Sequence, residues 1–215
     1  MPPTRESPVS SSLSSPIPPI ARARMDSRFV TPLRAGIAVG GAALLLLYGL
    51  AAVSASAGST ALRAPAVSLV ALPSLSAQVT AAVNRVRLAH GRQPLTPAAG
   101  LKAAALQHST EMGRDGYFAH DSHDGTAFWK RLQAFYPAPA SGCWAVGENL
   151  VYAGPELTAA QAIQLWLQSP EHRRNLLDPH WQQLGVAAVQ VTGAAGVFGG
   201  QTVTVITNDF GARVC

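Results

Sequence analysis

Three side chains that could do chemistry stand on short, separate segments of the chain. His120 closes the sequence Tyr-Phe-Ala-His, Glu148 lies in Gly-Glu-Asn-Leu, and His172 lies in Ser-Pro-Glu-His. Two imidazoles and a carboxylate could bind a divalent metal ion, or they could act as an acid and a base. Both functions require the three segments to meet in space, so the elements that position them decide the matter.

Other chemistries remain open for the same residues. Three protein ligands would leave a metal position free for water, as a metallohydrolase requires, although the sequence has no His-Glu-x-x-His helix. Ser169 and His172 could serve as nucleophile and base, but no Gly-x-Ser-x-Gly turn surrounds the serine. A third alternative is a buried hydrogen-bonded network that holds the fold together and binds nothing.

The first part of the chain has the pattern of a leader. Residues 35–62 carry no charge, arginines precede them, and Ala55-Ser56-Ala57 supplies a small-residue cleavage site. This pattern predicts a signal peptide cleaved after Ala57, with Met25 as an alternative start. The alternative is a membrane anchor through residues 35–53, since the uncharged run is long enough to span a bilayer. We therefore expect a leader at residues 1–57, a linker at 58–75 and one domain at 76–215, secreted or periplasmic.

Charge argues against a nucleic-acid partner. The whole chain carries a formal net charge of +5. Five arginines and two carboxylates fall within the leader, so little positive charge remains on the exported part. No run of Lys and Arg interleaved with aromatic residues occurs there, and we expect no nucleic-acid binding. A membrane would enter only through an uncleaved leader.

The two cysteines both belong to the exported part. Cys143 lies mid-domain and Cys215 is the last residue. An even number of cysteines in an oxidising compartment predicts a disulfide between them. The alternative is that one of the two thiols is a nucleophile.

Hydrophobic periodicity predicts helices first and strands later. Helical spacing indicates a helix ending at His90 and others near residues 97–113, 128–135 and 158–169. His108 falls on the apolar stripe of the second, which favours a core histidine over a ligand. β-Branched runs predict strands at residues 184–191 and 202–207, with a third near 147–152. This order indicates an α+β fold.

The motifs in this order resemble the bacterial branch of the CAP superfamily, which includes cysteine-rich secretory proteins, insect antigen 5 and plant pathogenesis-related class 1 proteins. Their shared module is called the SCP domain. The resemblance covers about residues 75–210 and rests on six elements in the same order: Asn84-Arg85-x-Arg87, Phe118-Ala119-His120, Gly147-Glu148-Asn149-Leu150, the Trp166 to Leu177 segment, Leu184-Gly185-Val186 and Asn208-Asp209-Phe210-Gly211.

The resemblance implies a three-layer α-β-α sandwich with a central antiparallel sheet and a surface cleft lined by a His/Glu tetrad. It assigns His120, Glu148 and His172 to that tetrad and, as metal ligands, to a divalent cation such as zinc. The fourth member, a glutamate in animal relatives, is Ser169 here, and Glu171 is the neighbouring substitute.

The resemblance also implies a function. We expect an exported binding module whose cleft holds a divalent cation and a small or lipidic ligand, since members of the superfamily are linked to sterol and lipid binding. The alternative is an extracellular peptidase or esterase that uses the same residues. The missing fourth carboxylate favours binding over catalysis.

Overall fold

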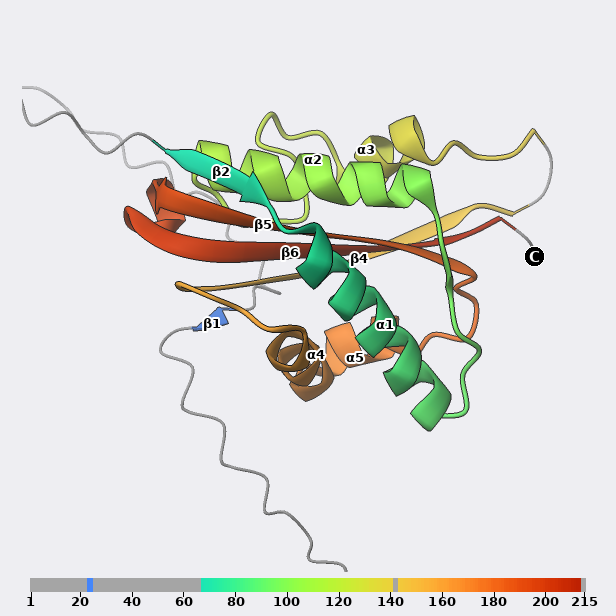
Figure 1. Cartoon of the computed structure of the whole chain (residues 1–215). Helices are drawn as coiled ribbons and strands as arrows, with labels where there is room; N and C mark the ends of the chain where they lie inside the picture. The colour runs from blue at the N-terminus through green and yellow to red at the C-terminus, as the bar shows by residue number, and fades with distance from the viewer. Residues whose placement is uncertain (1–22, 25–66, 141–142, 214–215) are drawn as a thin grey trace, which may run out of the picture.

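The computed structural model describes residues 23–24, 67–140 and 143–213, and Figure 1 shows its helices and strands. In chain order these are β1 (Ala23–Arg24), β2 (Ser68–Ala71), α1 (Pro73–Ala89), β3 (Thr96–Pro97), α2 (Ala99–Asp115), α3 (Phe128–Phe135), β4 (Ala145–Ala153), α4 (Ala159–Gln168), α5 (Pro170–Leu176), β5 (Gln183–Ala194), the 3₁₀ turn η1 (Gly196–Phe198) and β6 (Gln201–Ala212).

The strands form one sheet in the order β1-β4-β6-β5-β2, and every neighbouring pair on this path is antiparallel. The short β3 adds a parallel pairing to the start of β5. The long β5–β6 hairpin is the centre of the sheet, and β4 lies alongside β6 with Glu148 opposite Asp209. This register brings two of the sequence motifs side by side.

Helices cover both faces of the sheet, with α2 and α3 on one side and α1, α4 and α5 on the other (Figure 1). The α+β class and the three-layer α-β-α sandwich with an antiparallel centre are confirmed. Each strand of the hairpin alternates its side chains between the two helix layers, as the pleat requires. The apolar core is therefore divided between the two faces, with one cluster on the α1/α4/α5 face and two smaller clusters on the α2/α3 face.

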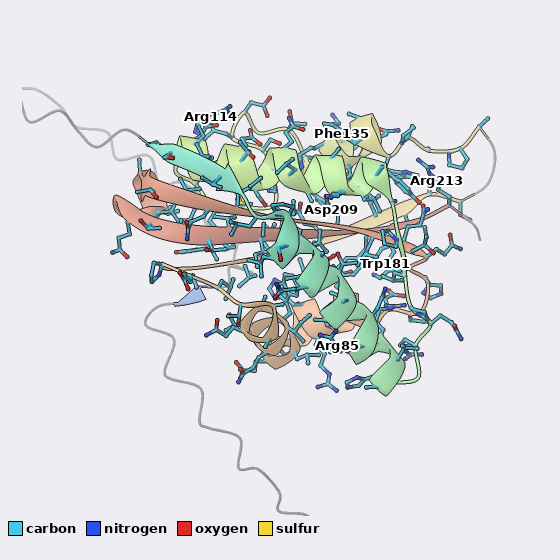
Figure 2. All side chains as sticks on the ribbon, in the orientation of Figure 1. Arg85, Arg114, Phe135, Trp181, Asp209 and Arg213 are labelled. Carbon is cyan, nitrogen blue, oxygen red and sulfur yellow. The ribbon has the colours of Figure 1, made fainter. Side chains whose placement is uncertain are left out.

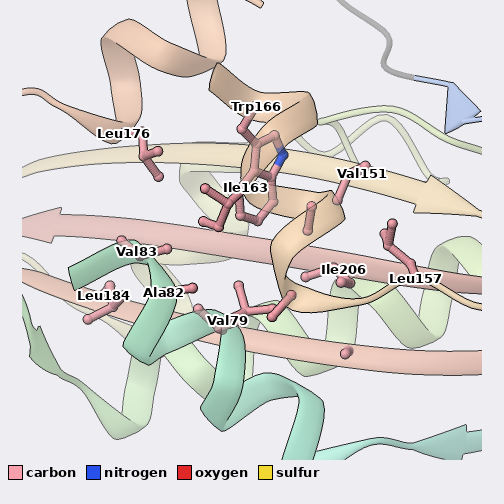
Figure 3. Close-up of a cluster of buried hydrophobic side chains, with 14 of the residues drawn as sticks. Val79, Ala82, Val83, Val151, Leu157, Ile163, Trp166, Leu176, Leu184 and Ile206 are labelled. Atoms are coloured by element: carbon pink, nitrogen blue, oxygen red, sulfur yellow. The ribbon is translucent and has the colours of Figure 1, made fainter. Parts of the chain in front are cut away.

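The larger cluster lies between the sheet and the α1/α4/α5 layer (Figure 3). Trp166 and Ile163 of α4 meet Val79 of α1 over strand residues such as Ile206. The Trp166 indole is fully buried and donates its N–H to the Leu150 carbonyl at 3.1 Å. Burial of its polar edge is therefore compensated, and α4 is tied directly to β4.

On the opposite face, α2 approaches β5 closely enough to require a glycine. A Cβ on Gly185 would collide with the α2 backbone at Leu101 and Lys102. Alanine or any larger residue would push α2 away from the sheet. The glycine thereby sets the spacing of the layer that carries His108.

The predicted helices and strands correspond to observed elements, but five observed elements were not predicted, namely β1, β2, β3, α5 and η1. Pro170 begins a further helix, α5, because proline is well tolerated in the first turn, where its missing N–H is not needed. β2 lies within the segment predicted as a linker and pairs with β5 from Ser68 to Ala71. Domain packing therefore extends into that segment.

Several expectations concern residues that the structure does not describe. The predicted leader lies outside the described residues except for β1, and the predicted anchor at 35–53 lies entirely outside them. No helix in the described ranges has the length and apolar character needed to cross a bilayer. Cys215 also lies outside them, and the described part contains no free cysteine, so the Cys143–Cys215 disulfide stays a prediction.

Candidate functional site

Glu148 and His120 form a hydrogen-bonded pair at the α2/α3 side of the sheet. The His120 Nδ1 lies 2.8 Å from Glu148 Oε1. The carboxylate is completely buried, whereas 40 % of the His120 side chain is exposed. The sequence elements carrying the two residues thus meet as expected. An imidazole held through Nδ1 by a carboxylate presents Nε2 outward in a fixed orientation.

Arg131 of α3 holds this pair from the other side. Its guanidinium donates from Nη2 to Glu148 Oε2, and from Nη1 to the His120 carbonyl at 2.9 Å. The arginine is 5 % exposed. One buried side chain therefore fixes both the carboxylate and the backbone of the histidine it orients. A charge-assisted pair of this kind is strong because little water screens it.

Asp209 places a second carboxyl group against the first. It lies opposite Glu148 across the β4–β6 ladder, is fully buried beneath α2, and is labelled in Figure 2. Burial, and then the charge of Glu148, raises the pKa of Asp209 well above its usual range. Burial also acts to raise the pKa of Glu148, but the hydrogen bond from His120 and the charge of Arg131 outweigh it, so this pKa is lowered. Glu148 is the ionised member and Asp209 the neutral one.

His108 completes the buried network from α2. Its side chain is fully buried, and its Nε2 lies 2.9 Å from the Ala119 carbonyl. Burial lowers the pKa of His108, so the ring is neutral and the Nε2–H donates to that carbonyl. The prediction of a core histidine with a satisfied hydrogen bond is confirmed. It anchors the backbone immediately before His120.

His172 stands at the other side of the site, on α5. Its Nδ1 lies 2.7 Å from Ser169 Oγ. Ser169 is thus the hydrogen-bond partner of His172 Nδ1, just as the carboxylate of Glu148 is the partner of His120 Nδ1. Glu171, the alternative fourth member, is exposed on α5, and among the described contacts it makes no hydrogen bond to either histidine.

Two asparagine amides tie α5 to the strand that carries Glu148. Asn175 donates to the Glu148 carbonyl at 3.1 Å and to Asn149 Oδ1 at 3.0 Å. Asn149 in turn donates to the His172 carbonyl at 3.0 Å. Both amides satisfy backbone carbonyls. The position of His172 relative to Glu148 is therefore set by this ladder.

Gly147 leaves room for the same ladder. A Cβ there would come within 2.8 Å of both Asn175 Oδ1 and the Trp181 ring. Trp181 donates its indole N–H to the Asn175 carbonyl at 2.9 Å and is labelled in Figure 2. The glycine that precedes Glu148 is thus required by the close approach of α5.

In both imidazoles Nδ1 is engaged in a hydrogen bond, which leaves Nε2 available. Within the described residues, neither His120 Nε2 nor His172 Nε2 has a hydrogen-bond partner. Burial, and then the nearby His120, lowers the pKa of His172, so this ring stays neutral at physiological pH. A neutral imidazole with a free Nε2 is a metal ligand or a hydrogen-bonding group for a small ligand.

Of the three predicted metal ligands, the two histidines suit a divalent cation best. His120 and His172 offer ring nitrogens suited to a borderline cation such as zinc. Glu148 fits less well as a direct ligand, because both of its oxygens are engaged and its side chain is fully buried. Among the described residues, no group of three His, Cys, Asp or Glu side chains has an arrangement suited to a metal ion.

Two residues of the site were missed by sequence reasoning. Arg131 lies on a short helix that was assigned only from its apolar spacing, and nothing local marks its partner 17 positions away. Asp209 belongs to the quoted Asn-Asp-Phe-Gly motif, but its partner became visible only from the β4–β6 register. Asp209 lies just beyond the strand predicted at residues 202–207, and a carboxylate so close to a β-branched run was the signal that could have been used.

Comparison with known proteins identifies the family of the chain. The family described as CAP: Cysteine-rich secretory protein family matches residues 80–205. Protein YkwD of Bacillus subtilis is 27 % identical over 113 residues, which are 53 % of this chain and 42 % of YkwD. The chain therefore spans less than half the length of that relative.

Solved structures give the same result. An extracellular protein containing a SCP domain from Bacillus anthracis is 27 % identical, with a TM-score of 0.51 over 66 % of this chain and 41 % of that one. An outer surface protein of Borrelia burgdorferi shares the fold at 16 % identity and a TM-score of 0.52, covering 63 % of this chain and 90 % of its own. The chain belongs to the CAP family and contains an SCP domain.

Proposed function

We propose that this SCP domain is an exported binding module, in which the Nε2 atoms of His120 and His172 hold a divalent cation such as zinc and contribute to binding a small or lipidic ligand. One observation carries the proposal: each imidazole is fixed through Nδ1, by Glu148 or by Ser169, and neither Nε2 has a partner among the described residues. Two pre-oriented imidazoles lose little freedom on binding a metal.

In this proposal Glu148 orients His120 and does not itself bind the cation. It accepts the Nδ1–H of His120, which selects the tautomer with a free Nε2 and fixes the orientation of the ring. Ser169 accepts the Nδ1–H of His172 in the same way, with a neutral oxygen in place of a charged one. Water or a ligand group would complete the coordination of the cation, because two imidazoles fill only part of a tetrahedral shell.

Export is part of the same proposal. The related protein from Bacillus anthracis is described as extracellular. The leader pattern at residues 1–57 supports the same compartment for this chain. A periplasmic or secreted location would also allow the predicted Cys143–Cys215 disulfide to form.

Calorimetric titration with zinc tests the site. His120→Ala and His172→Ala should each weaken zinc binding by at least about tenfold, since each removes one of two ligands. Ser169→Ala should weaken it less, because it removes only the group that orients His172. His180→Ala serves as the matched control, because His180 is exposed and pairs with Asp178 outside this site. Equal affinity in all four variants would refute the proposal.

A hydrolase is the second candidate, and the contact between Ser169 and His172 is the observation in its favour. The geometry is less favourable than in a serine hydrolase, where the base uses Nε2 rather than the Nδ1 engaged here. Ester turnover that disappears in Ser169→Ala, and that survives a chelator, would establish serine catalysis. Turnover abolished by the chelator and by His120→Ala would instead indicate metal-dependent hydrolysis.

A further inference from the structure

A second polar site lies on the outer side of α5, away from the His120–His172 pair. A pocket of about 490 Å³ is lined by Arg92, Arg173 and Arg174, and the loop from Leu177 to His180 forms another of its walls. Arg92 comes from the turn after α1, while the other two arginines belong to α5. We call it the arginine pocket. Its size is in the range of pockets that bind small molecules.

The three guanidinium groups of the arginine pocket have no acidic partner in the described part of the chain. None of the ion pairs or side-chain hydrogen bonds found there involves Arg92, Arg173 or Arg174. The pocket has one carboxylate, Asp178, and its Oδ1 already accepts from the His180 backbone N–H at 2.9 Å and lies 2.8 Å from His180 Nδ1. Positive charge therefore exceeds negative charge at this place, although the domain as a whole is nearly balanced.

Buried Arg87 supports the loop that borders the pocket. Its guanidinium donates to the Leu176 carbonyl at 2.8 Å and to the Asp178 carbonyl at 3.0 Å. The side chain is fully buried, and its Nη2 has no partner within the described residues. Its Nε–H also donates to the Gln93 carbonyl at 2.9 Å, next to Arg92. One arginine thus joins the two chain segments that form the pocket and adds a fourth positive charge beneath it.

We propose that the arginine pocket binds the phosphate group of a phosphate ester. Guanidinium groups match phosphate oxygens in pairs and remain charged at any physiological pH. All three arginines line one pocket, whose walls come from two segments fixed to each other by Arg87. A carboxylate ligand has fewer oxygens to accept hydrogen bonds, whereas a phosphate group has enough oxygens for all three guanidinium groups.

This site is separate from the metal site of the proposed function. His172 is buried and contacts Ser169, whereas the next residue on the same helix, Arg173, is exposed. The two sites thus use different faces of α5, one buried and one exposed. Loss of one is not expected to abolish the other, which allows the two proposals to fail independently.

Titration with glycerol phosphate tests the pocket in solution, and co-sedimentation with phosphatidylcholine vesicles, with and without phosphatidylglycerol, tests a lipid headgroup. We expect the wild type to bind glycerol phosphate saturably, or to bind only the vesicles that contain phosphatidylglycerol. Arg173→Ala should weaken this binding by about tenfold, as expected for one lost charge-assisted hydrogen bond. Arg173→Ala/Arg174→Ala should weaken it further. Binding should also weaken as salt is raised.

Lys102→Ala is the matched control, since it removes one exposed positive charge from α2, far from the pocket. Arg173→Lys/Arg174→Lys keeps the charge and removes the paired donors, and it should bind less well than the wild type. His120→Ala should bind like the wild type. No saturable binding to either probe would overturn the proposal, as would an equal loss in Lys102→Ala. Unchanged melting temperatures would exclude misfolding as the cause of a loss.

Discussion

Arg131 is the side chain on which the geometry of the His120–Glu148 pair most depends. It is the buried positive partner of a buried carboxylate, and it also holds the His120 backbone. Removing it leaves Glu148 charged and without its main counterion. An uncompensated buried charge costs far more than the loss of an exposed ion pair.

We therefore expect Arg131→Ala to lower the free energy of unfolding by about 3–5 kcal/mol, the range for breaking a buried ion pair. Lys130→Ala, next to it on the exposed side of α3, should change stability by less than about 0.5 kcal/mol. Urea unfolding at neutral pH measures both values. Similar effects in the two variants would mean that Arg131 is not the counterion of Glu148.

Asp209→Asn should make the protein more stable at neutral pH. Because the pKa of Asp209 is raised in the folded state, the unfolded chain releases this proton first, and the folded state is penalised as pH rises above about 3.9, the ordinary value for aspartate. An amide carries no such penalty and can still donate to Glu148. The gain over the wild type should grow as pH rises from about 4 and vanish below it.

Urea unfolding of both proteins from about pH 3.5 to neutral pH would follow this difference. A variant that is less stable than the wild type at neutral pH would show that Asp209 is ionised and stabilised there by Arg131. The neutral assignment of Asp209 would then be wrong.

At the level of the elements, the contact between α2 and β5 determines how close the two layers lie. Gly185→Ala would place a methyl group against the α2 backbone, which cannot rotate aside. Overpacking of this kind costs about 1–3 kcal/mol or more. Since α2 carries His108, the variant should also weaken zinc binding through a displaced His120.

Gly113→Ala is the matched control for that prediction. Its added methyl would collide with Val191 Cγ2, which is a side-chain methyl group rather than backbone. Alanine also favours a helix over glycine by about 1 kcal/mol, which offsets the strain. Thermal unfolding should therefore rank Gly185→Ala well below Gly113→Ala. The reverse order would show that the α2 backbone yields more readily than Val191.

Local pattern was enough to predict most elements of this fold, because apolar spacing reports directly which face of a helix or strand is buried. It failed for α5, where Pro170 was taken to end a helix, although proline both ends one helix and starts the next here. The motifs identified His120, Glu148 and His172 as candidate site residues. Arg131 and Asp209 could not be paired with Glu148 from sequence, because their contact depends on strand register and helix placement.

For the molecule as a whole, two buried histidines predict a loss of stability in mild acid. Burial lowers the pKa of both His108 and His172 in the folded state. The unfolded chain therefore takes up protons first, and the free energy of unfolding should fall as pH drops below about 6.5. Glu148, whose pKa is lowered, adds a further loss only below about pH 4.3.

Free energies of unfolding measured from about pH 5 to about pH 8 would test this dependence. His108→Gln keeps a donor for the Ala119 carbonyl and should flatten the profile between about pH 5 and about pH 6.5. His180→Gln, at an exposed position, should leave the profile as it is in the wild type. A profile that is flat in the wild type would contradict the assignment of two neutral buried imidazoles.

The two imidazoles of the site differ in the kind of backbone that carries them. His172 belongs to a helix tied to β4, whereas His120 precedes a turn in which Ser122, Gly125 and Thr126 bond to one another. Just beyond that turn, the Phe128 backbone N–H donates to the Asp121 carboxylate, and Arg131 donates to the His120 carbonyl. Residues 122–126 can therefore gain or lose length without moving either ring nitrogen. Evolution could reshape what enters beside the two imidazoles while the orientation of their rings stays constant.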